Sequence, residues 1–313
     1  MAQLTRLTHA DLAIMTGLPE AFARAHIPNE ALASTEWRRL TPDERDNAIL
    51  GAIKENERTD LASAGPEGIA RWEKGWAEVA ARVARDGASE DSLKPQYFRY
   101  EFMRLLGDFA RPEARDLEYR IHKILSELVF RTHLAGLDSV VEFACGTGIN
   151  LMRIGKIFPT YKLTGCDWAK PSQDILARIA GQHGIKLGGK LVNLWTGEGA
   201  DPAALAHGRT GVLTVHGLEQ IGAGWGPFFK IVDAIKPAIV VHIEPIAELY
   251  DPNRLLDALA TRYHKKRKYL DGFLTEIRSR EQSGRAEIVA TKRFNFGSSF
   301  QEAYTLVAWR PKG

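Results

Sequence analysis

"VVEFACGTGINLMRIG", residues 140–155, joins an apolar run to two glycines and a helical pattern. The apolar run predicts a buried strand ending near Ala144, and the pattern from Asn150 onward predicts a helix. Between them, Gly146 and Gly148 allow the backbone to bend tightly and to approach a ligand closely. Because the first turn of a helix carries free N–H groups, this strand–turn–helix predicts a site for a small anionic or hydroxyl-rich ligand.

Strand-like and helical segments alternate after residue 136, which is typical of βαβ units around a parallel sheet. The pattern predicts strands at 139–144, 161–167, 190–196, 211–217 and 238–245, and helices at 150–158, 172–184, 201–208, 226–236 and 253–282. Two last strand-like runs, 286–297 and 302–311, are separated by only a few residues, which favours an antiparallel pair. The predicted fold is α/β: a Rossmann-like, mostly parallel seven-stranded sheet with an antiparallel C-terminal strand.

The first part of the chain has a different texture, and its segments predict helices. Thr41, Pro42 and Glu44 form the capping-box signature of a helix start. A second helix is expected up to Gly87, with Trp72 and Trp76 packing in the core or, alternatively, forming a substrate platform, and a third is expected over 111–136. The sequence therefore divides into two regions: a helical N-terminal region, residues 1–135, and a Rossmann-like cofactor-binding domain, residues 136–313.

Composition limits the class of protein. The 313 residues are 44% apolar and 26% charged, an ordinary globular mixture, and the net charge of +3 argues against a nucleic-acid partner. No stretch reaches the roughly 18 apolar residues of a membrane span and the start has no signal-like apolar run, so we expect a cytoplasmic protein without a membrane partner. Cys145 and Cys166 suggest no disulfide framework and are expected as small core or pocket-wall residues. No metal ligands are predicted, and the oligomeric state stays open.

An acidic residue at the end of the second predicted strand indicates the kind of ligand. Asp167 lies 19 residues after Gly148, where a carboxylate can accept hydrogen bonds from both ribose hydroxyls. A nucleoside-containing cofactor is therefore expected. The dinucleotide fingerprint G-x-G-x-x-G would need a third glycine at position 151, where this chain has Leu151, and there is no phosphate-binding loop motif.

Residues 137–313 resemble the class I, Rossmann-like S-adenosylmethionine-dependent methyltransferases. The resemblance lies in the stretch Glu142–Gly148, with Ala144 in place of a first glycine, in Asp167, and in the antiparallel last strand. It implies S-adenosylmethionine as cofactor, with Glu142 orienting its amino group or the loop, the glycines admitting it and Asp167 holding its ribose. The cofactor-binding residues implied are Glu142, Ala144, Gly146, Thr147, Gly148, Asp167 and, for the adenine, Asn193, with Thr196 or Glu198 as alternatives.

Candidate catalytic groups follow the fourth and fifth predicted strands, where this fold places its reacting groups. His216 is expected to take the proton of the methyl acceptor or to fix its position, and Glu219 and Glu244 are the other candidates. His242 and Glu244 share one strand face, so both line the cleft or both pack under a helix.

The resemblance also implies that residues 1–135 form a lid over the substrate. Within 94–104, Tyr97, Arg99 and Tyr100 are the candidate substrate-binding residues, the alternative being an ordinary amphipathic helix start. The sequence thus predicts a methyltransferase acting on an O or N atom of a small molecule or peptide. The alternatives are a catalytically inactive cofactor-binding interaction or regulatory module and an NAD-dependent oxidoreductase.

Overall fold

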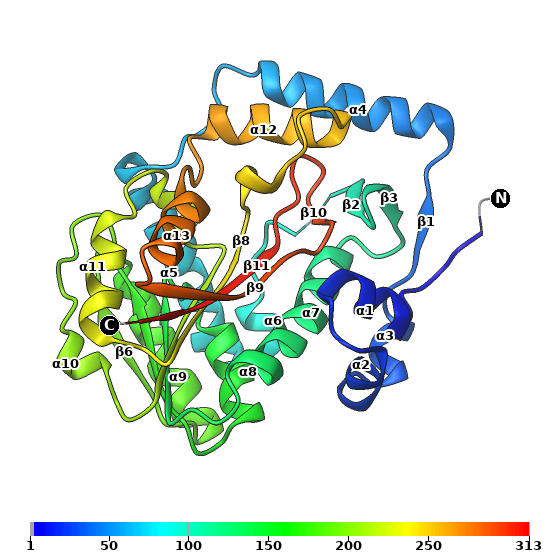
Figure 1. Cartoon of the computed structure of the whole chain (residues 1–313). Coiled ribbons are helices and arrows are strands. Elements are labelled where there is room, and N and C mark those ends of the chain that lie inside the picture. Colours follow the sequence, from blue (N-terminus) through cyan, green and yellow to red (C-terminus); the bar gives the residue numbers. More distant parts are fainter. Residues whose placement is uncertain (1–2, 99, 313) are drawn as a thin grey trace.

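A seven-stranded sheet forms the centre of the computed structural model, which describes residues 3–98 and 100–312 (Figure 1). Its strand order is β6-β5-β4-β7-β8-β11-β9. The strands are β4 (Ser139–Phe143), β5 (Lys162–Asp167), β6 (Leu187–Leu191), β7 (Thr210–Val215), β8 (Ile239–Glu244), β9 (Ala286–Arg293) and β11 (Thr305–Pro311). The first five are parallel in the Rossmann order 3-2-1-4-5, and β11 runs antiparallel to both β8 and β9. The predicted fold class is confirmed.

Helices cover both faces of this sheet, as its parallel strands require. One face carries α7 (Leu117–His133), α8 (Ile149–Ile157) and α9 (Lys170–His183). The other carries α10 (Pro202–Leu205), α11 (Gly226–Ile235) and α13 (Phe273–Gln282). Strand residues alternate between the two cores: Leu213 packs in the first, and its neighbour Val212 packs in the second. The predicted helical stretch 253–282 is two helices, α12 (Leu255–Arg267) and α13.

The N-terminal region is mostly helical, as expected. It contains α1 (His9–Thr16), α2 (Glu20–His26), α3 (Asn29–Ala33), α4 (Pro42–Glu57), the short η1 (Pro66–Gly68), α5 (Ile69–Asp86) and α6 (Glu90–Leu93). The predicted capping box is confirmed at the start of α4, where the Glu44 N–H donates to Thr41 Oγ1 at 3.3 Å and the Thr41 N–H donates to Glu44 Oε2 at 3.0 Å. Helix α5 ends at Gly87 as predicted.

Three strands of this region were not predicted. They are β1 (Trp37–Arg39), β2 (Met103–Leu105) and β3 (Asp108–Pro112), and together with β10 (Phe296–Gly297) they form an antiparallel sheet in the order β1-β3-β2-β10. Leu106 and Gly107 both have positive φ, 54° and 85°, which is the two-residue hairpin turn that joins β2 to β3. Consequently the helix expected over 111–136 begins only at Leu117, and no helix begins within the described residues 94–98 and 100–104.

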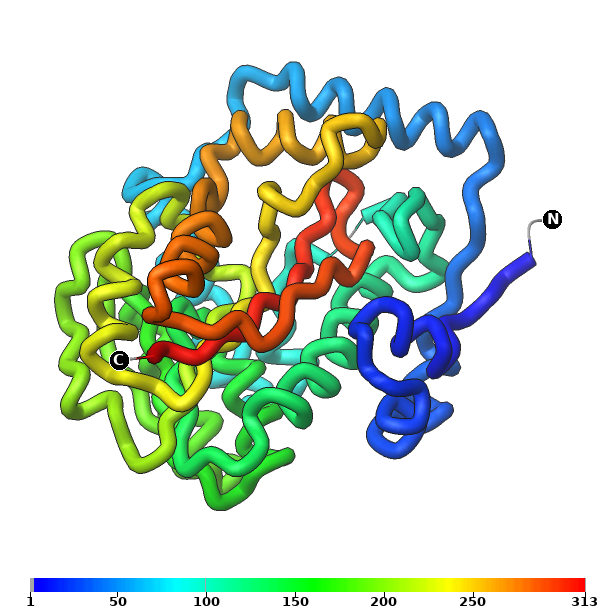
Figure 2. The backbone as a smooth tube through the Cα atoms, in the orientation of Figure 1, coloured from blue at the N-terminus to red at the C-terminus, as the bar shows by residue number. Residues whose placement is uncertain are grey.

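The small sheet joins segments that are far apart in the sequence. In Figure 2 the red chain between β9 and β11 reaches the teal segment that contains β2 and β3, and Phe296 pairs with Leu105. The division at residue 135 stays a prediction, and the β1-β3-β2-β10 sheet contains strands from both sides of it. None of the described helices combines the length and the apolarity needed to span a bilayer.

The third strand of the parallel sheet lies earlier than predicted, at 187–191 instead of 190–196. After Leu191, which pairs with Asp167, the chain turns: Asn193 Oδ1 accepts from the Trp195 N–H at 2.9 Å. Val192 and Leu194 are buried in this turn against the second core, which explains why an apolar run there resembles a strand.

Candidate functional site

The glycine turn after β4 has the unusual backbone that the sequence indicates. Ala144, Gly146 and Gly148 have φ of 53°, 53° and 70°, and α8 begins directly after Gly148. Asp167 at the end of β5 ties this turn in place: its Oδ2 accepts from the Gly146 N–H at 2.8 Å and its Oδ1 from the Ala169 N–H at 2.9 Å. Burial raises the pKa of Asp167 to about 6, although the backbone donors oppose the shift. Each carboxylate oxygen keeps a second lone pair for a ligand.

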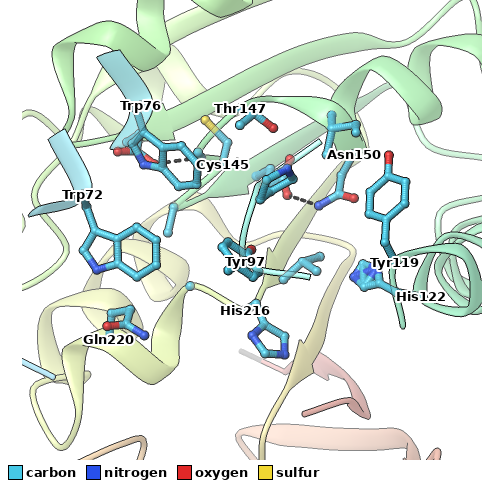
Figure 3. Close-up of a pocket in the computed structure, with 18 of the residues that line it drawn as sticks. Trp72, Trp76, Tyr97, Tyr119, His122, Cys145, Thr147, Asn150, His216 and Gln220 are labelled. Carbon is cyan, nitrogen blue, oxygen red and sulfur yellow. Dashed lines mark hydrogen bonds between the residues drawn. The ribbon is translucent and has the colours of Figure 1, made fainter. Parts of the chain in front are cut away.

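A cavity lies beside this turn (Figure 3), with about 860 Å³ of empty space including its open mouth. Its walls come from the glycine turn, from the end of β7 and from the N-terminal region. The lining residues are Trp72, Trp76, Pro95, Tyr97, Phe98, Tyr119, His122, Glu142, Ala144, Cys145, Gly146, Thr147, Ile149, Asn150, Arg153, Asp167, Trp168, Val215, His216, Gly217, Gln220 and Tyr304.

Two acceptor atoms on the cavity wall lack donors. Asn150 Nδ2 donates to Glu142 Oε1 at 2.8 Å, a bond drawn dashed beside Asn150 in Figure 3. The remaining oxygens, Glu142 Oε2 and Asn150 Oδ1, are buried and find no partner among the described residues. Burial raises the pKa of Glu142 to about 8, against the effect of the Asn150 bond. Since buried polar atoms are normally hydrogen-bonded, this pair is suited to a ligand that supplies N–H donors.

Aromatic side chains cover the glycine turn. Trp72 and Trp76 of α5 stack with ring centroids 5.6 Å apart, and both line the cavity, while Trp76 also packs against a hydrophobic cluster. A Cβ on Gly146 would lie 2.9 Å from Trp76 Cζ2, so the missing side chain makes room for the indole. On the Asp167 side, Trp168 lines the cavity and stacks on Trp195 at 4.7 Å. Trp76 thus shows both core packing and a place in the cavity wall, and the substrate platform stays a prediction.

His216 occupies the end of β7 with a strained backbone, φ 55°, held by a hydrogen bond from its N–H to the Ile243 carbonyl at 3.1 Å. Its Nδ1 lies 3.5 Å from Glu219 Oε1, and its Nε2 has no partner among the described residues. Burial opposes a positive charge on the ring, but the carboxylates of Glu219, Glu244 and Glu118 outweigh it and raise the pKa of His216 to about 9.

Glu244 lies behind the turn that presents His216. Its Oε1 accepts from the N–H groups of Gly217 and Leu218 at 3.0 and 3.1 Å, and its Oε2 accepts from the Glu219 N–H at 3.4 Å. On the same strand face, the His242 ring lies between Thr214 Oγ1, at 2.8 Å from Nδ1, and the Trp309 indole N–H, at 3.0 Å from Nε2. Of the two alternatives for this strand face, packing beneath neighbouring elements is the one observed.

Of the other predicted site residues, some line the cavity and others lie away from it. Thr147 and Tyr97 line the cavity, and Tyr97 exposes 48% of its surface. Its hydroxyl end is desolvated near Glu219 and Glu118, so its pKa is raised. Asn193 holds the turn after β6, and Tyr100 packs edge-on against Phe300. Arg99 lies outside the described residues.

Several residues in the cavity wall or directly behind it were missed because they come from the N-terminal region or from the segment before β11. Glu118 and His122 lie four residues apart on α7, followed by Ser126, whose Oγ is 3.2 Å from His122 Nδ1. In the sequence, these polar residues four positions apart form a stripe beside the apolar face of α7, and this stripe could have indicated a polar site on the helix. The Tyr304 hydroxyl donates to Glu118 Oε1 at 3.2 Å, and its ring centroid lies 4.7 Å from that of His216.

Cys145 and Cys166 are buried free cysteines, which confirms the expectation of small core or pocket-wall residues. Within residues 3–98 and 100–312, no group of three or more His, Cys, Asp or Glu side chains is arranged to hold a metal ion.

Comparison with solved structures gives similar architectures at low identity. The 16S rRNA methylase RmtB is 12% identical over 97% of this chain and 98% of its own, with a TM-score of 0.46. The geranyl diphosphate C-methyltransferase of Streptomyces coelicolor A3(2) is 14% identical over 80% and 100%, with a TM-score of 0.45. The [4+2]-cyclase SpnF is 14% identical over 81% and 98%, with a TM-score of 0.48. No family model and no curated protein matches the sequence. By its own strand order, the fold is that of the class I methyltransferases.

One expectation about partners needs correction. The small net charge led to the prediction that nucleic acid is not a partner, and the likeness to a 16S rRNA methylase contradicts it. The net charge is a sum over the whole chain, and a sum does not describe the surface around one cavity.

Proposed function

We propose that this protein is an S-adenosylmethionine-dependent methyltransferase and that the acceptor is a small molecule. The observation that carries the proposal is one cavity with two different walls: the glycine turn with Asp167 and Glu142 on one side, and His216 with Tyr304 on the other. The first wall is suited to a nucleoside-containing amino-acid cofactor, and the second to an acceptor that must lose a proton.

The residues of the first wall fit the cofactor. Asp167 retains lone pairs for the ribose hydroxyls, and the unpartnered oxygens of Glu142 and Asn150 suit the ammonium group of the methionine moiety. The backbone of Gly146–Gly148 allows close approach, and Trp168 offers an aromatic surface beside Asp167. When bound, S-adenosylmethionine supplies an electrophilic methyl group carried on a sulfonium.

The residues of the second wall bind the acceptor and take its proton. His216 presents Nε2, which in the neutral imidazole accepts a proton from a hydroxyl or ammonium group. Glu219 orients the ring through Nδ1, and Glu244 acts as a positioning residue because it holds three backbone N–H groups of the following turn. Residues 1–135 serve as the lid: Trp72, Trp76, Tyr97, Tyr119 and His122 all line the cavity.

Two experiments test the proposal: the first measures which cofactor binds, and the second measures whether a methyl group is transferred. Isothermal titration should show binding of S-adenosylhomocysteine and none of NADH; the reverse would favour an oxidoreductase and refute the proposal. Methyl transfer is then measured with tritiated S-adenosylmethionine on pools of small amines, phenols, peptides and RNA. Transfer to small molecules supports the proposal, transfer to RNA or peptide alone overturns the acceptor class, and binding without transfer to any pool leaves the inactive binding module as the better account.

His216→Ala tests the second wall. If His216 takes the acceptor's proton, kcat should fall about 10²–10⁴-fold while the Kd for S-adenosylhomocysteine changes little. A folded variant with near-normal kcat would remove His216 from the mechanism.

A further inference from the structure

A groove lies at the end of the parallel strands opposite to the cavity. The cavity is lined by residues that follow β4 and that end β5, whereas the groove is lined by Asp138, directly before β4, and by Lys162, the first residue of β5. The lining continues along the edge strand β6 and reaches His207 in the segment after α10. A partner bound in this groove would therefore lie away from the glycine turn and His216.

One face of β6 is not covered by a helix in this groove. A Cβ on Gly189 would lie 2.1 Å from Gln173 Oε1 of α9, so α9 covers that face of the strand. Gly188 faces the other way, and a Cβ there would meet no atom within 4 Å. The helix on that side, α10, has only four residues. Since parallel sheets normally carry helices on both faces, this part of the sheet is open to a partner.

Three lysines give the groove a positive charge. Lys162, Lys186 and Lys190 are exposed, and none of them forms an ion pair or a side-chain hydrogen bond with another described residue. Asp138 is the one carboxylate among the lining residues, and its Oδ2 already accepts from the Arg209 N–H at 2.6 Å. Three unpaired cations beside one engaged carboxylate indicate a surface for an anionic partner.

The lysines follow the direction of the strands. The Lys186 carbonyl accepts from the Leu163 N–H at 2.8 Å, which places Lys186 beside Lys162 at the start of two neighbouring strands. Like charges side by side repel each other, and an anion bound near both removes this repulsion. Lys190 is four residues further along β6, about 13 Å away at the usual rise of a strand. Lysines can protect an edge strand from pairing, but Lys162 belongs to β5, an inner strand.

We propose that this groove binds the phosphate backbone of a nucleic acid. Lysine ammonium groups bind phosphates as point charges, and charges spaced along a strand suit a chain of anions better than a single anion. The nucleic acid is a docking partner and not the methyl acceptor, because the groove and the cavity lie at opposite ends of the strands. The inference goes beyond the proposed function and does not depend on it.

An acidic peptide suits the groove less well. A peptide that adds a strand to a sheet needs free backbone groups along the edge and pockets for its side chains. The Leu187 N–H already donates to the Ile185 carbonyl at 2.8 Å. A Cβ on Gly199 would lie 2.0 Å from the Leu191 carbonyl oxygen, so a loop lies against the far end of β6. Ala204 is the one exposed apolar side chain of the lining, which leaves little to anchor a peptide.

The experiment measures the fluorescence anisotropy of labelled oligo(U) with the full chain. Three lysines that each neutralise one phosphate of a single strand give a slope of log Kd against log salt of about 2, so Kd should rise about twentyfold from about 50 to about 200 mM KCl. Lys190→Gln should weaken binding and lower this slope by about 0.7. Lys162→Gln, Lys186→Gln and Lys190→Gln in one chain should abolish binding. Lys265→Gln, which removes an exposed lysine of α12, is the control and should change neither quantity.

No binding at about 50 mM KCl, a slope that Lys190→Gln leaves unchanged, or an equal loss in Lys265→Gln would overturn the inference. Tighter binding of a polyglutamate peptide than of oligo(U) of equal charge would also overturn it and assign the groove to an acidic protein. The triple variant should keep the native urea midpoint and the native Kd for S-adenosylhomocysteine, so that its loss of oligo(U) binding is not a loss of folding. If the triple variant does not fold, Lys190→Gln against Lys265→Gln decides the question.

Discussion

Replacing Glu219 by glutamine should change the protonation of His216. In the native protein the pKa of His216 lies at about 9 instead of 6.5, a difference of about 3 kcal/mol in favour of the charged ring. Glu219 is the nearest carboxylate, with Oε1 at 3.5 Å from Nδ1, and an opposite charge at this distance shifts a pKa by about 1–3. Because Glu118 and Glu244 remain in Glu219→Gln, we expect the pKa of His216 to fall only part of the way, to between about 7 and 8.

The direction in which Glu219→Gln changes kcat follows from the protonation state of the His216 ring. The neutral ring, which takes the acceptor's proton, is the minor form below about pH 9 in the native protein, so kcat should rise roughly tenfold per pH unit toward that value and then level. In Glu219→Gln the plateau should begin 1–2 pH units lower. The other groups that act on the ring, Glu118, Glu244, His122 and His264, are unchanged.

Two measurements check this reasoning. Histidine NMR, with the His216 signal assigned from its loss in His216→Ala, gives the pKa directly, and steady-state kinetics from pH 6 to 10 gives the catalytic midpoint. Glu30→Gln, an exposed carboxylate on α3, is the control and should leave both midpoints unchanged. A His216 pKa near 6.5 in the native protein, or one that does not move in Glu219→Gln, would refute the electrostatic argument.

Three further perturbations probe the cofactor wall and the core beneath it. Asp167→Asn should raise the Kd of S-adenosylhomocysteine about tenfold or more, because the charge on the ribose-binding group is lost; an unchanged Kd by titration would contradict the ribose assignment. Gly146→Ala should weaken the same binding, since its Cβ would lie 2.9 Å from Trp76 at φ 53°, and Trp76→Ala in the same chain should relieve the clash but not the backbone strain. His242→Ala should cost about 2–4 kcal/mol of unfolding free energy in urea, through a cavity and a lost partner for Trp309, while titrated cofactor affinity is kept.

The parallel sheet could be predicted because its signals are local. Strands β4, β7 and β8 are short apolar runs, each followed by a helical period, and the short connection before the last run favours the antiparallel pair that β9 and β11 form. The small sheet could not be predicted in this way. Its strands are two to five residues long, and β10 pairs with β2 across more than 190 positions of sequence. A pairing between such short and distant segments depends on tertiary packing and leaves little periodic pattern.

The glycine turn and Asp167, which we propose as the cofactor-binding wall, could be brought together from the sequence for a similar reason. Gly146, Gly148 and Asp167 occur at fixed offsets from strand ends, and the fold brings strand ends to one edge. Asn193 shows the limit: its position after the third strand suggested an adenine contact, but its Oδ1 bonds the Trp195 N–H, as an Asx turn does. At a strand end, a polar side chain that satisfies its own backbone cannot be distinguished by position from one that faces a ligand.

The acceptor wall was only partly accessible because it is assembled across the whole chain. His216 directly follows β7, Tyr304 directly precedes β11, and Tyr97 lies between α6 and β2. Glu118, which accepts the hydrogen bond of Tyr304, comes from α7. None of these residues has a spacing relation to another, and Glu118 and Tyr304 meet because α7 packs in the same hydrophobic cluster as the residues directly before β11. Under the proposed function, substitutions at these acceptor-wall residues should therefore change the acceptor. The cofactor should stay the same as long as the glycine turn is kept. If the proposed function holds, acceptor specificity depends on the contacts between residues 1–135 and the sheet.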